Sequence, residues 1–209
     1  MGLFRKLLNQ TRKPEGFLGS VMLSGMNIGH VYVADWAMSL LQNMINKPDR
    51  IAELGCGNGR DAGELLKIYD SANLTAVDYS PLSVERTAKN NQELVNAGRM
   101  SVVQGDVSDL QLEPESFNLA TAFETIYFWP GLERCFKEVC KILKPGGHFM
   151  IVSESDGHDK ISQWFKKRID GMNTYTALEI ETALKAAGFA SITTEHHQTR
   201  PWIMVLAQK

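Results

Sequence analysis

Four residues near the first quarter of the chain combine one carboxylate with three glycines at alternate positions. Glu53 is followed by Gly55, Gly57 and Gly59 in the stretch Ile51-Ala52-Glu53-Leu54-Gly55-Cys56-Gly57-Asn58-Gly59. Glycine lets the backbone turn with unusual dihedral angles and lets a ligand approach with no Cβ in between. A carboxylate at this place would repel a pyrophosphate and attract an amino or sulfonium group. The stretch therefore predicts a binding site for a small ligand that carries positive charge.

The residues around the glycines follow the pattern of strand, turn and helix. The apolar stretch 51–54 is typical of a strand, and Ala62, Leu65, Leu66 and Tyr69 fall on one face of a helix. This layout is typical of a nucleotide-binding crevice, where the free N–H groups of the helix point at the ligand. The spacing G-x-G-x-G differs from the G-x-G-x-x-G that holds the pyrophosphate of a dinucleotide.

Two further acids follow predicted strands. Asp78 ends the apolar stretch 73–78, at the place where a carboxylate accepts hydrogen bonds from ribose hydroxyls. Asp78 could instead cap the helix that begins at Pro81, but Ser80 is the better cap and leaves Asp78 free. Asp106 comes after the strand 100–104 and is equally well explained as a turn residue.

Glu53 to Gly59 resembles motif I of the class I S-adenosylmethionine-dependent methyltransferases, written E/D-x-G-x-G-x-G. The resemblance is to small-molecule enzymes of the methyltransferase type 11 kind, and it extends to roughly the end of the chain. Leu143-Lys144-Pro145-Gly146-Gly147 is a further hallmark of that family. The resemblance implies that Glu53, through the glycine-loop network, holds the amino-acid end of S-adenosylmethionine, that Asp78 holds its ribose, and that Asp106 and Val107 hold its adenine. The cofactor-binding residues expected in this way are Glu53, Gly55, Cys56, Gly57, Gly59, Asp78, Tyr79, Asp106, Val107 and Phe123.

An acidic and aromatic run follows the predicted strand 117–123 at the ligand edge of the sheet. The run is Glu124-Thr125-Ile126-Tyr127-Phe128-Trp129-Pro130, and it belongs either to the core or to a functional loop. Family members that methylate planar amide or adenine amines show D/N-P-P-[FYW] here, so that substrate class is disfavoured. An acceptor that must lose a proton would use a base, and the candidate catalytic residues are Glu124, Tyr127 and His30. His30 is equally well explained as a surface or hydrogen-bonded structural histidine.

The composition limits the other classes of function. The chain has 209 residues and a net charge of −2, so it has no overall basic field that would gather nucleic acid. Three cysteines give neither a disulfide framework nor a metal site, and we expect no metal and a reducing, cytoplasmic location. No apolar run approaches the length of a membrane span, and no membrane partner is expected. Residues 1–13 predict a short amphipathic helix on its own domain, with a membrane-surface contact as the less favoured alternative.

Strands and helices alternate from Ile51 to Phe149, which predicts parallel strands joined by right-handed crossovers. A final pair at 190–195 and 202–207 brings the number of strands to seven. The resemblance implies an α/β, Rossmann-like, mostly parallel sheet of order 3-2-1-4-5-7-6, with strand 7 antiparallel and helices on both faces. We expect a helical cap over residues 1–47 and a class I methyltransferase domain over 48–209. Within the cap, 14–29 is expected to be irregular and 32–46 helical.

The expected function is in-line methyl transfer from S-adenosylmethionine to a small-molecule acceptor, by a monomer or homodimer. Two alternatives remain open at this point. A regulatory protein could bind the cofactor without turnover, because cofactor motifs do not prove catalysis. A nicotinamide-dependent oxidoreductase shares the sheet but would want the wider glycine spacing and no acid at Glu53. A macromolecular substrate is a weaker idea, and the sequence leaves the acceptor open.

Overall fold

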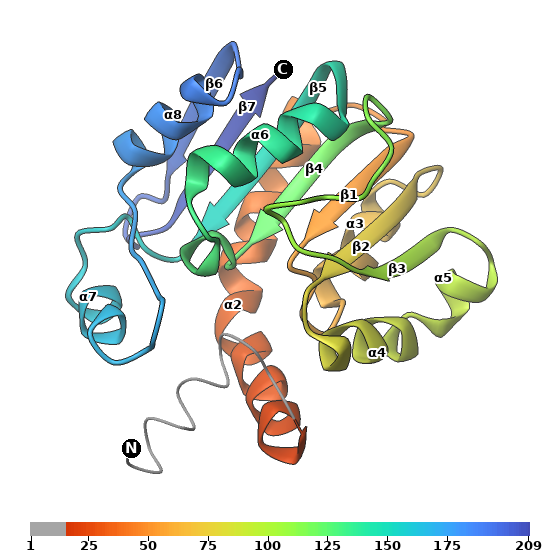
Figure 1. Cartoon of the computed structure of the whole chain (residues 1–209), viewed down its shortest axis with the longest axis horizontal. Helices are drawn as coiled ribbons and strands as arrows, with labels where there is room; N and C mark the ends of the chain where they lie inside the picture. Colours follow the sequence, from red (N-terminus) through yellow and green to blue (C-terminus); the bar gives the residue numbers. More distant parts are fainter. Residues whose placement is uncertain (1–15) are drawn as a thin grey trace.

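A computed structural model describes the backbone of residues 16–209 and the side chains of residues 30–209. The chain forms one twisted seven-stranded sheet with helices on both faces (Figure 1). The strand order is β3-β2-β1-β4-β5-β7-β6. Strand β7 runs antiparallel to both β5 and β6, whereas the pairs from β3 to β5 are parallel. The predicted fold class and strand order are confirmed.

The elements alternate along the chain as expected for crossover connections. The strands are β1 (Arg50–Leu54), β2 (Asn73–Asp78), β3 (Met100–Gln104), β4 (Phe117–Phe123), β5 (Leu143–Ser153), β6 (Ser191–His196) and β7 (Ile203–Gln208). The helices are α2 (Gly16–Met44), α3 (Arg60–Ile68), α4 (Pro81–Asn90), α5 (Gln92–Asn96), α6 (Leu132–Ile142), α7 (Lys160–Lys166) and α8 (Ala177–Ala186), with a 3₁₀ turn η1 (Ile126–Phe128).

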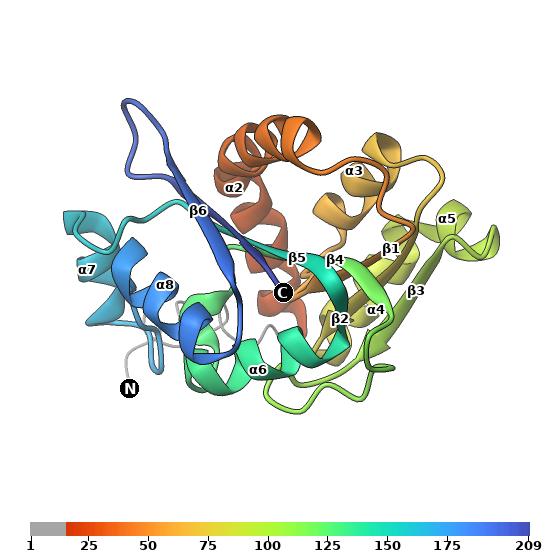
Figure 2. The same ribbon diagram turned by 90° about the horizontal axis from the view of Figure 1, so that it is seen from above.

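Each face of the sheet has its own apolar core because the central strands are buried on both sides. Helices α2 and α3 cover one face, and α6 and α8 cover the other (Figure 2). Ile51 and Leu119 pack under α2 and α3, whereas Phe149 packs against Phe136 of α6 with ring centroids 5.5 Å apart. Burying a large apolar side chain stabilises the fold by about 1.5–3 kcal/mol, so these two layers are the main support of the strand tips.

Helix α2 differs from the expectation. It is continuous from Gly16 to Met44, so the prediction of irregular structure over 16–29 was wrong. A glycine inside a helix costs only about 1 kcal/mol relative to alanine, and no proline interrupts this segment. Val33, Ala37 and Leu41 are fully buried in the same core as the sheet, so the second half of the predicted cap packs with the domain.

The length of α2 raises the question of a membrane span. Helix α2 has 29 residues, yet among residues 16–209 no helix combines the length and the apolar character needed to cross a membrane. The predicted amphipathic helix over residues 1–13 lies outside the described residues. The predicted division of the chain at residue 47 falls in the link between α2 and β1 and stays a prediction.

Two other boundaries differ from the sequence pattern. The predicted helix over 81–96 is divided into α4 and α5 at Asn91, whose side-chain amide donates to the carbonyl oxygens of Gly59 and Thr87 at 2.9 and 3.0 Å. Strand β5 begins at Leu143, so the predicted turn over 144–147 is already part of the strand, next to an irregularity in its pairing with β4. Both differences arise from tertiary hydrogen bonds that have no periodic signature.

Candidate active site

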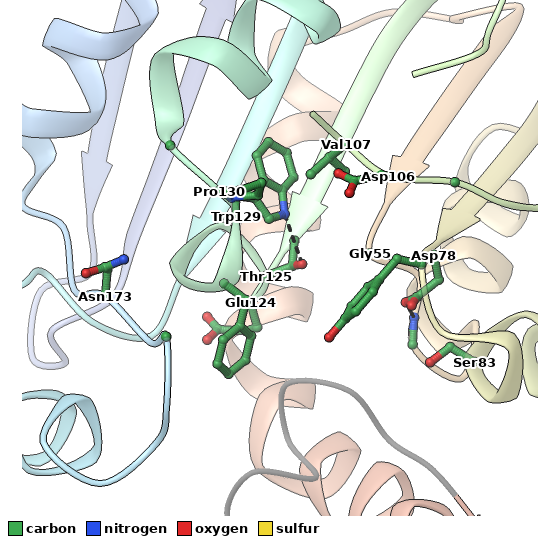
Figure 3. Close-up of a pocket in the computed structure, with 16 residues that line it drawn as sticks. Gly55, Asp78, Ser83, Asp106, Val107, Glu124, Thr125, Trp129, Pro130 and Asn173 are labelled. Atoms are coloured by element: carbon green, nitrogen blue, oxygen red, sulfur yellow. Dashed lines mark hydrogen bonds between the residues drawn. The ribbon is translucent and has the colours of Figure 1, made fainter. Parts of the chain in front are cut away.

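A cavity of about 420 Å³ lies at the carboxyl ends of β1, β2 and β4 (Figure 3). The parallel topology brings these strand tips to one edge of the sheet, where ligands of open α/β sheets bind. Six of the ten predicted cofactor-binding residues line it: Gly55, Gly57, Asp78, Tyr79, Asp106 and Val107. The cavity therefore brings together the glycine turn and Asp106, which are about fifty residues apart in the sequence.

The first two glycines of the turn have different roles. Gly57 has φ +58°, and the position of a Cβ there has no atom within 4 Å, so its missing side chain leaves the cavity open. Gly55 has φ +87°, and a Cβ there would lie 2.3 Å from Thr125 Oγ1. The chain can therefore pack closely against the loop after β4 only with glycine at this position. Gly59 begins α3 and faces α4 rather than the cavity.

Asp78 holds the turn and also lines the cavity. Its Oδ2 accepts a hydrogen bond from the backbone N–H of Gly57, and its Oδ1 accepts one from that of Ser80, both at 2.9 Å. Ser80 caps α4 as predicted, so Asp78 is not needed as the cap of that helix. Burial raises the pKa of Asp78, and the two backbone N–H groups oppose that shift. A carboxylate still has lone pairs left for ligand hydroxyls.

Asp106 is a turn aspartate that also lines the cavity, and its expected contact with the adenine stays a prediction. Its Oδ1 accepts hydrogen bonds from the backbone N–H and the hydroxyl of Ser108, both at 2.8 Å, which is the pattern of a turn aspartate. Asp106 and Val107 also lie on the cavity wall beside Trp129 (Figure 3). The turn fixes the orientation of this carboxylate on the cavity wall.

Glu53 does not line the cavity, because it is 2% exposed beneath the turn. Its Oε2 has no hydrogen-bond partner among the described residues. Burial, together with the charges of Asp61 and Asp78, raises the pKa of Glu53 well above its usual value, and Arg60 opposes this. A cation bound near the turn would stabilise the ionised form of this buried carboxyl.

The remaining two predicted cofactor residues lie on the other side of the turn. Cys56 and Phe123 line a smaller pocket together with His30, Gly57 and Glu124. Burial raises the pKa of the Cys56 thiol well above its ordinary value, so it is inert as a nucleophile. This pocket connects the glycine turn with the predicted catalytic residues.

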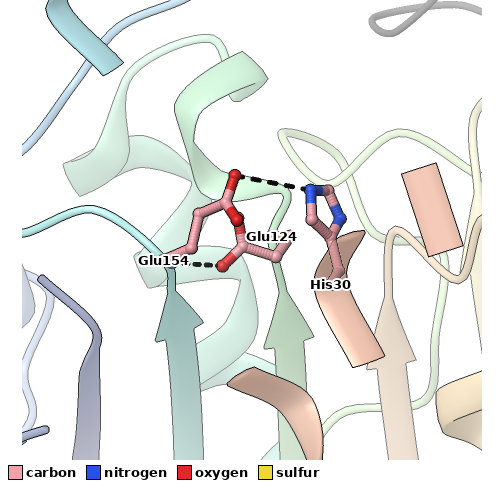
Figure 4. A group of neighbouring side chains, drawn as sticks. All are labelled: His30, Glu124 and Glu154. Carbon is pink, nitrogen blue, oxygen red and sulfur yellow. Dashed lines mark hydrogen bonds and ion pairs between the residues drawn. The ribbon is translucent and has the colours of Figure 1, made fainter. Parts of the chain in front are cut away.

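The three predicted catalytic residues come together, and Glu154 joins them. His30 comes from α2, Glu124 follows β4, and Glu154 follows the neighbouring strand β5 (Figure 4). His30 Nε2 lies 3.6 Å from Glu154 Oε1, and the backbone N–H of Glu154 donates to Glu124 Oε1. The Tyr127 hydroxyl donates to Glu124 Oε2 at 3.4 Å. Glu124 is therefore held between a tyrosine and a histidine–carboxylate pair.

The pKa values of the ionisable groups in this cluster suit a base that works near neutral pH. Burial raises the pKa of Glu124 to about 8; the charge of His30 opposes this shift and that of Glu154 adds to it. Burial alone would lower the pKa of His30, but its hydrogen bond to Glu154 and the charges of Glu124, Glu154 and Asp61 raise it to about 9. A group with a pKa close to the working pH exchanges protons most effectively.

The same cluster has donor atoms that a metal ion could use. Donor atoms of His30, Glu124 and Glu154 lie within 4.8 Å of one another, and one imidazole with two carboxylates suits a transition metal. However, both oxygens of Glu124 already accept hydrogen bonds, and His30 is paired with Glu154. We assign no metal to the cluster, because its groups satisfy one another through hydrogen bonds and an ion pair.

Several lining residues were not predicted. Thr125 accepts a hydrogen bond from Trp129 Nε1 at 3.2 Å, and both line the large cavity. Asn173 reaches the cavity from the loop after α7, where its backbone N–H donates to the Tyr127 carbonyl at 2.8 Å. The position of Thr125 next to Glu124 was a usable signal, whereas no pattern in the sequence pointed to Asn173.

The sequence is similar to that of known methyltransferases. Residues 52–151 match the family model described as "Methyltransferase domain". The chain is 29% identical over 154 residues to the sterol 24-C-methyltransferase of Clavispora lusitaniae, which covers 69% of this chain and 41% of that protein. The chain thus spans about two fifths of the length of this relative.

Solved structures share the fold. An S-adenosylmethionine-dependent methyltransferase from Mesorhizobium loti superposes with a TM-score of 0.68 at 19% identity, covering 84% of this chain and 98% of that one. The phosphoethanolamine N-methyltransferase 2 of Haemonchus contortus, solved with S-adenosyl-L-methionine, has a TM-score of 0.71 at 17% identity and covers 84% of this chain and 52% of that one. At these identities the likeness shows the fold.

Proposed function

Since the chain carries a class I S-adenosylmethionine-dependent methyltransferase domain, we propose that it transfers a methyl group from S-adenosylmethionine to a small-molecule acceptor. The observation that carries the proposal is the single cavity at the strand tips, which brings Gly57, Asp78 and Asp106 together with Glu124. The residues expected to hold the donor therefore line the same cavity as Glu124, a buried carboxyl with a raised pKa.

The residues fit the donor on four points. The open face of Gly57 leaves room for a ligand against the backbone. Asp78 lies at the tip of β2, where it would accept hydrogen bonds from ribose hydroxyls. The unpartnered Oε2 of buried Glu53 suits a cationic group near the turn. Asp106 and Val107 would hold the adenine at the opposite side of the cavity.

The donor supplies a methyl carbon activated by the sulfonium, so the acceptor lone pair forms the new bond and the carbon–sulfur electron pair stays on sulfur. The protein's task is to align the groups and exclude water. Alignment of this kind can supply roughly 7–11 kcal/mol of the barrier. Trp129, which is 5% exposed and stacked 6.2 Å from Phe149, gives the cavity a rigid wall for this purpose.

Glu124 is the residue that we expect to move a proton. It lies on the wall of the cavity, and its backbone has φ +53°, which is unusual for a residue with a side chain. Such strain costs on the order of 1–3 kcal/mol and is found most often at functional sites. Tyr127 and His30 act through Glu124, by a hydrogen bond and by charge respectively.

Binding and turnover measurements test the proposal against its alternatives. Isothermal titration calorimetry should show binding of S-adenosylmethionine and S-adenosylhomocysteine and no binding of nicotinamide dinucleotides. Release of S-adenosylhomocysteine in the presence of a panel of small acceptors would separate an enzyme from a regulatory binding protein. Absence of binding of both adenosyl compounds would refute the proposal outright.

The class of acceptor, the cellular location, the oligomeric state and the partners of the protein stay predictions. A net charge of −2 favours a small-molecule acceptor over nucleic acid. Cytoplasmic location, a monomeric or homodimeric state and the lack of a membrane partner belong to the same proposal. Light scattering of the purified chain would test the oligomeric state, and a pull-down would test for a macromolecular substrate.

A further inference from the structure

A second cavity adjoins the first. It has a volume of about 240 Å³ and lies between the ends of β4 and β5, the loop around α7 and the loop between β6 and β7. Glu124 and Asn173 line both cavities, so they form the wall between them. Pockets for drug-sized ligands measure roughly 300–1,000 Å³, so this cavity suits a smaller molecule.

The charged groups of the second cavity are mainly acidic. Glu124, Glu154 and Asp159 line it, whereas among the described side chains Arg200 is the only cationic one in the lining, and it is exposed. The Asp159 carboxylate is occupied by the hydroxyls of Ser155 and Ser162, where it caps α7. Glu124 and Glu154 also accept hydrogen bonds or an ion pair within their own cluster, but each carboxylate keeps lone pairs that a ligand can use.

The cluster contains two carboxyl groups and one imidazole (Figure 4), and its two glutamates line the cavity. Once both carboxyls are ionised and His30 is protonated, the cluster has two negative charges and one positive charge. A ligand with one positive charge would complete the balance. The charged groups facing Glu124 are His30 from α2 and Glu154 from the end of β5, with the Tyr127 hydroxyl from η1.

The opposite walls are aromatic. Tyr127, Phe165, Tyr175 and Trp202 line the cavity, and each is buried or half-buried. Their faces can pack against the apolar stem of a small molecule and attract a cation. The cavity thus combines an acidic inner end with an apolar body.

We propose that the second cavity binds the methyl acceptor and that this acceptor is a small primary or secondary amine, whose ammonium group lies against Glu124 and Glu154. The inference rests on the proposed transferase function. The ammonium must lose a proton before it can attack. An N–H bond breaks, its electron pair stays on nitrogen, and the proton forms the carboxylic acid of Glu124. Glu124 then gives this proton to Glu154, which is half exposed and releases it to water, so that both carboxylates are restored.

Calorimetry on the protein without donor tests the inference with 2-phenylethylamine and its neutral isostere 2-phenylethanol. We expect the amine to bind more tightly than the alcohol, and the substitutions Glu124→Gln and Glu154→Gln each to weaken amine binding by roughly tenfold or more. Glu154 does not line the first cavity, so Glu154→Gln keeps the test decisive if Glu124→Gln fails to fold. The exposed Glu85→Gln, on α4, is the matched control and should change nothing.

A proton readout adds a second criterion. At about pH 7, a bound ammonium would lower the raised pKa of Glu124, so amine binding should release protons in the wild type but not in Glu124→Gln. Comparison of binding enthalpies in phosphate and in Tris measures this release. Equal affinity for amine and alcohol, amine binding that is insensitive to both variants, or binding that requires added Mn²⁺ would each overturn the inference.

The outcome is separable from the donor test. If S-adenosylhomocysteine binds and the amine does not, the amine class is wrong and the transferase proposal stands. If S-adenosylhomocysteine fails to bind, the transferase proposal itself is wrong.

Discussion

Asp78 Oδ2 accepts a hydrogen bond of 2.9 Å from the backbone N–H of Gly57, so one carboxylate links the tip of β2 to the glycine turn after β1. The two residues are 21 positions apart in the sequence and lie on the same cavity wall. Because the carboxylate holds the turn and also faces the cavity, the same group fixes the shape of the expected donor site and can bond to the donor.

Asp78→Asn should weaken donor binding. The amide keeps the size of the side chain but loses the charge that strengthens hydrogen bonds to backbone N–H groups and ligand hydroxyls. We expect the Kd for S-adenosylhomocysteine to rise by roughly 10- to 100-fold, the range for a charge-assisted hydrogen bond. Calorimetry measures it, and Asp70→Asn, at an exposed position just after α3, is the control that should leave the Kd unchanged.

Gly57→Ala should separate backbone strain from ligand exclusion. Gly57 and Gly98 both have positive φ, +58° and +70°, and a Cβ at either would meet no atom within 4 Å. Each alanine variant should therefore lose about 1–2 kcal/mol of unfolding free energy, measured by urea denaturation. Only Gly57→Ala places its methyl group in the cavity, so only that variant should lose binding of S-adenosylhomocysteine. Equal binding by the two variants would mean that the ligand lies elsewhere.

The strand tips show what the sequence could predict. Asp78 ends one predicted parallel strand and Asp106 lies two residues after another, and a parallel topology brings those ends to one edge. The same logic places Glu124 beside Glu154, because β4 and β5 are neighbours with Phe123 opposite Val152. Local periodicity located the ends of these strands, and the strand order that the family resemblance implied placed them side by side.

Other positions depend on contacts that leave no periodic trace. Asn173 reaches both cavities because its backbone N–H bonds to the Tyr127 carbonyl, 46 residues earlier. Glu53 was expected to act through the glycine loop, and the structure places it buried under the turn and outside the lining of the cavity. Helix α2 continues through its glycines, where the turn-forming tendency of glycine suggested irregular structure.

Tyr127→Phe should shift the pH dependence of turnover. The Tyr127 hydroxyl stabilises the ionised form of Glu124, so its removal raises the pKa of that carboxyl. If Glu124 acts as the base, kcat rises with pH through a pKa near 8, and this limb should move to higher pH by roughly half to one unit. Tyr69→Phe, which removes a hydroxyl bonded to the Ile45 carbonyl, is the control. An unmoved limb would show that Glu124 is not the titrating group.

Glu124 should also make the fold less stable as the pH rises. Its folded pKa of about 8 exceeds its ordinary 4.5, so the folded state binds more protons between these values and the unfolding free energy falls with increasing pH. The raised pKa of His30 acts in the same direction, but only above about pH 6.5. From pH 5 to pH 6.5, Glu124→Gln should therefore lose less stability than the wild type, by up to about 2 kcal/mol in urea denaturation. Parallel curves for wild type and Glu124→Gln would show that the buried carboxyl is ionised throughout, and with that result Glu124 would lose its claim to exchange a proton near neutral pH.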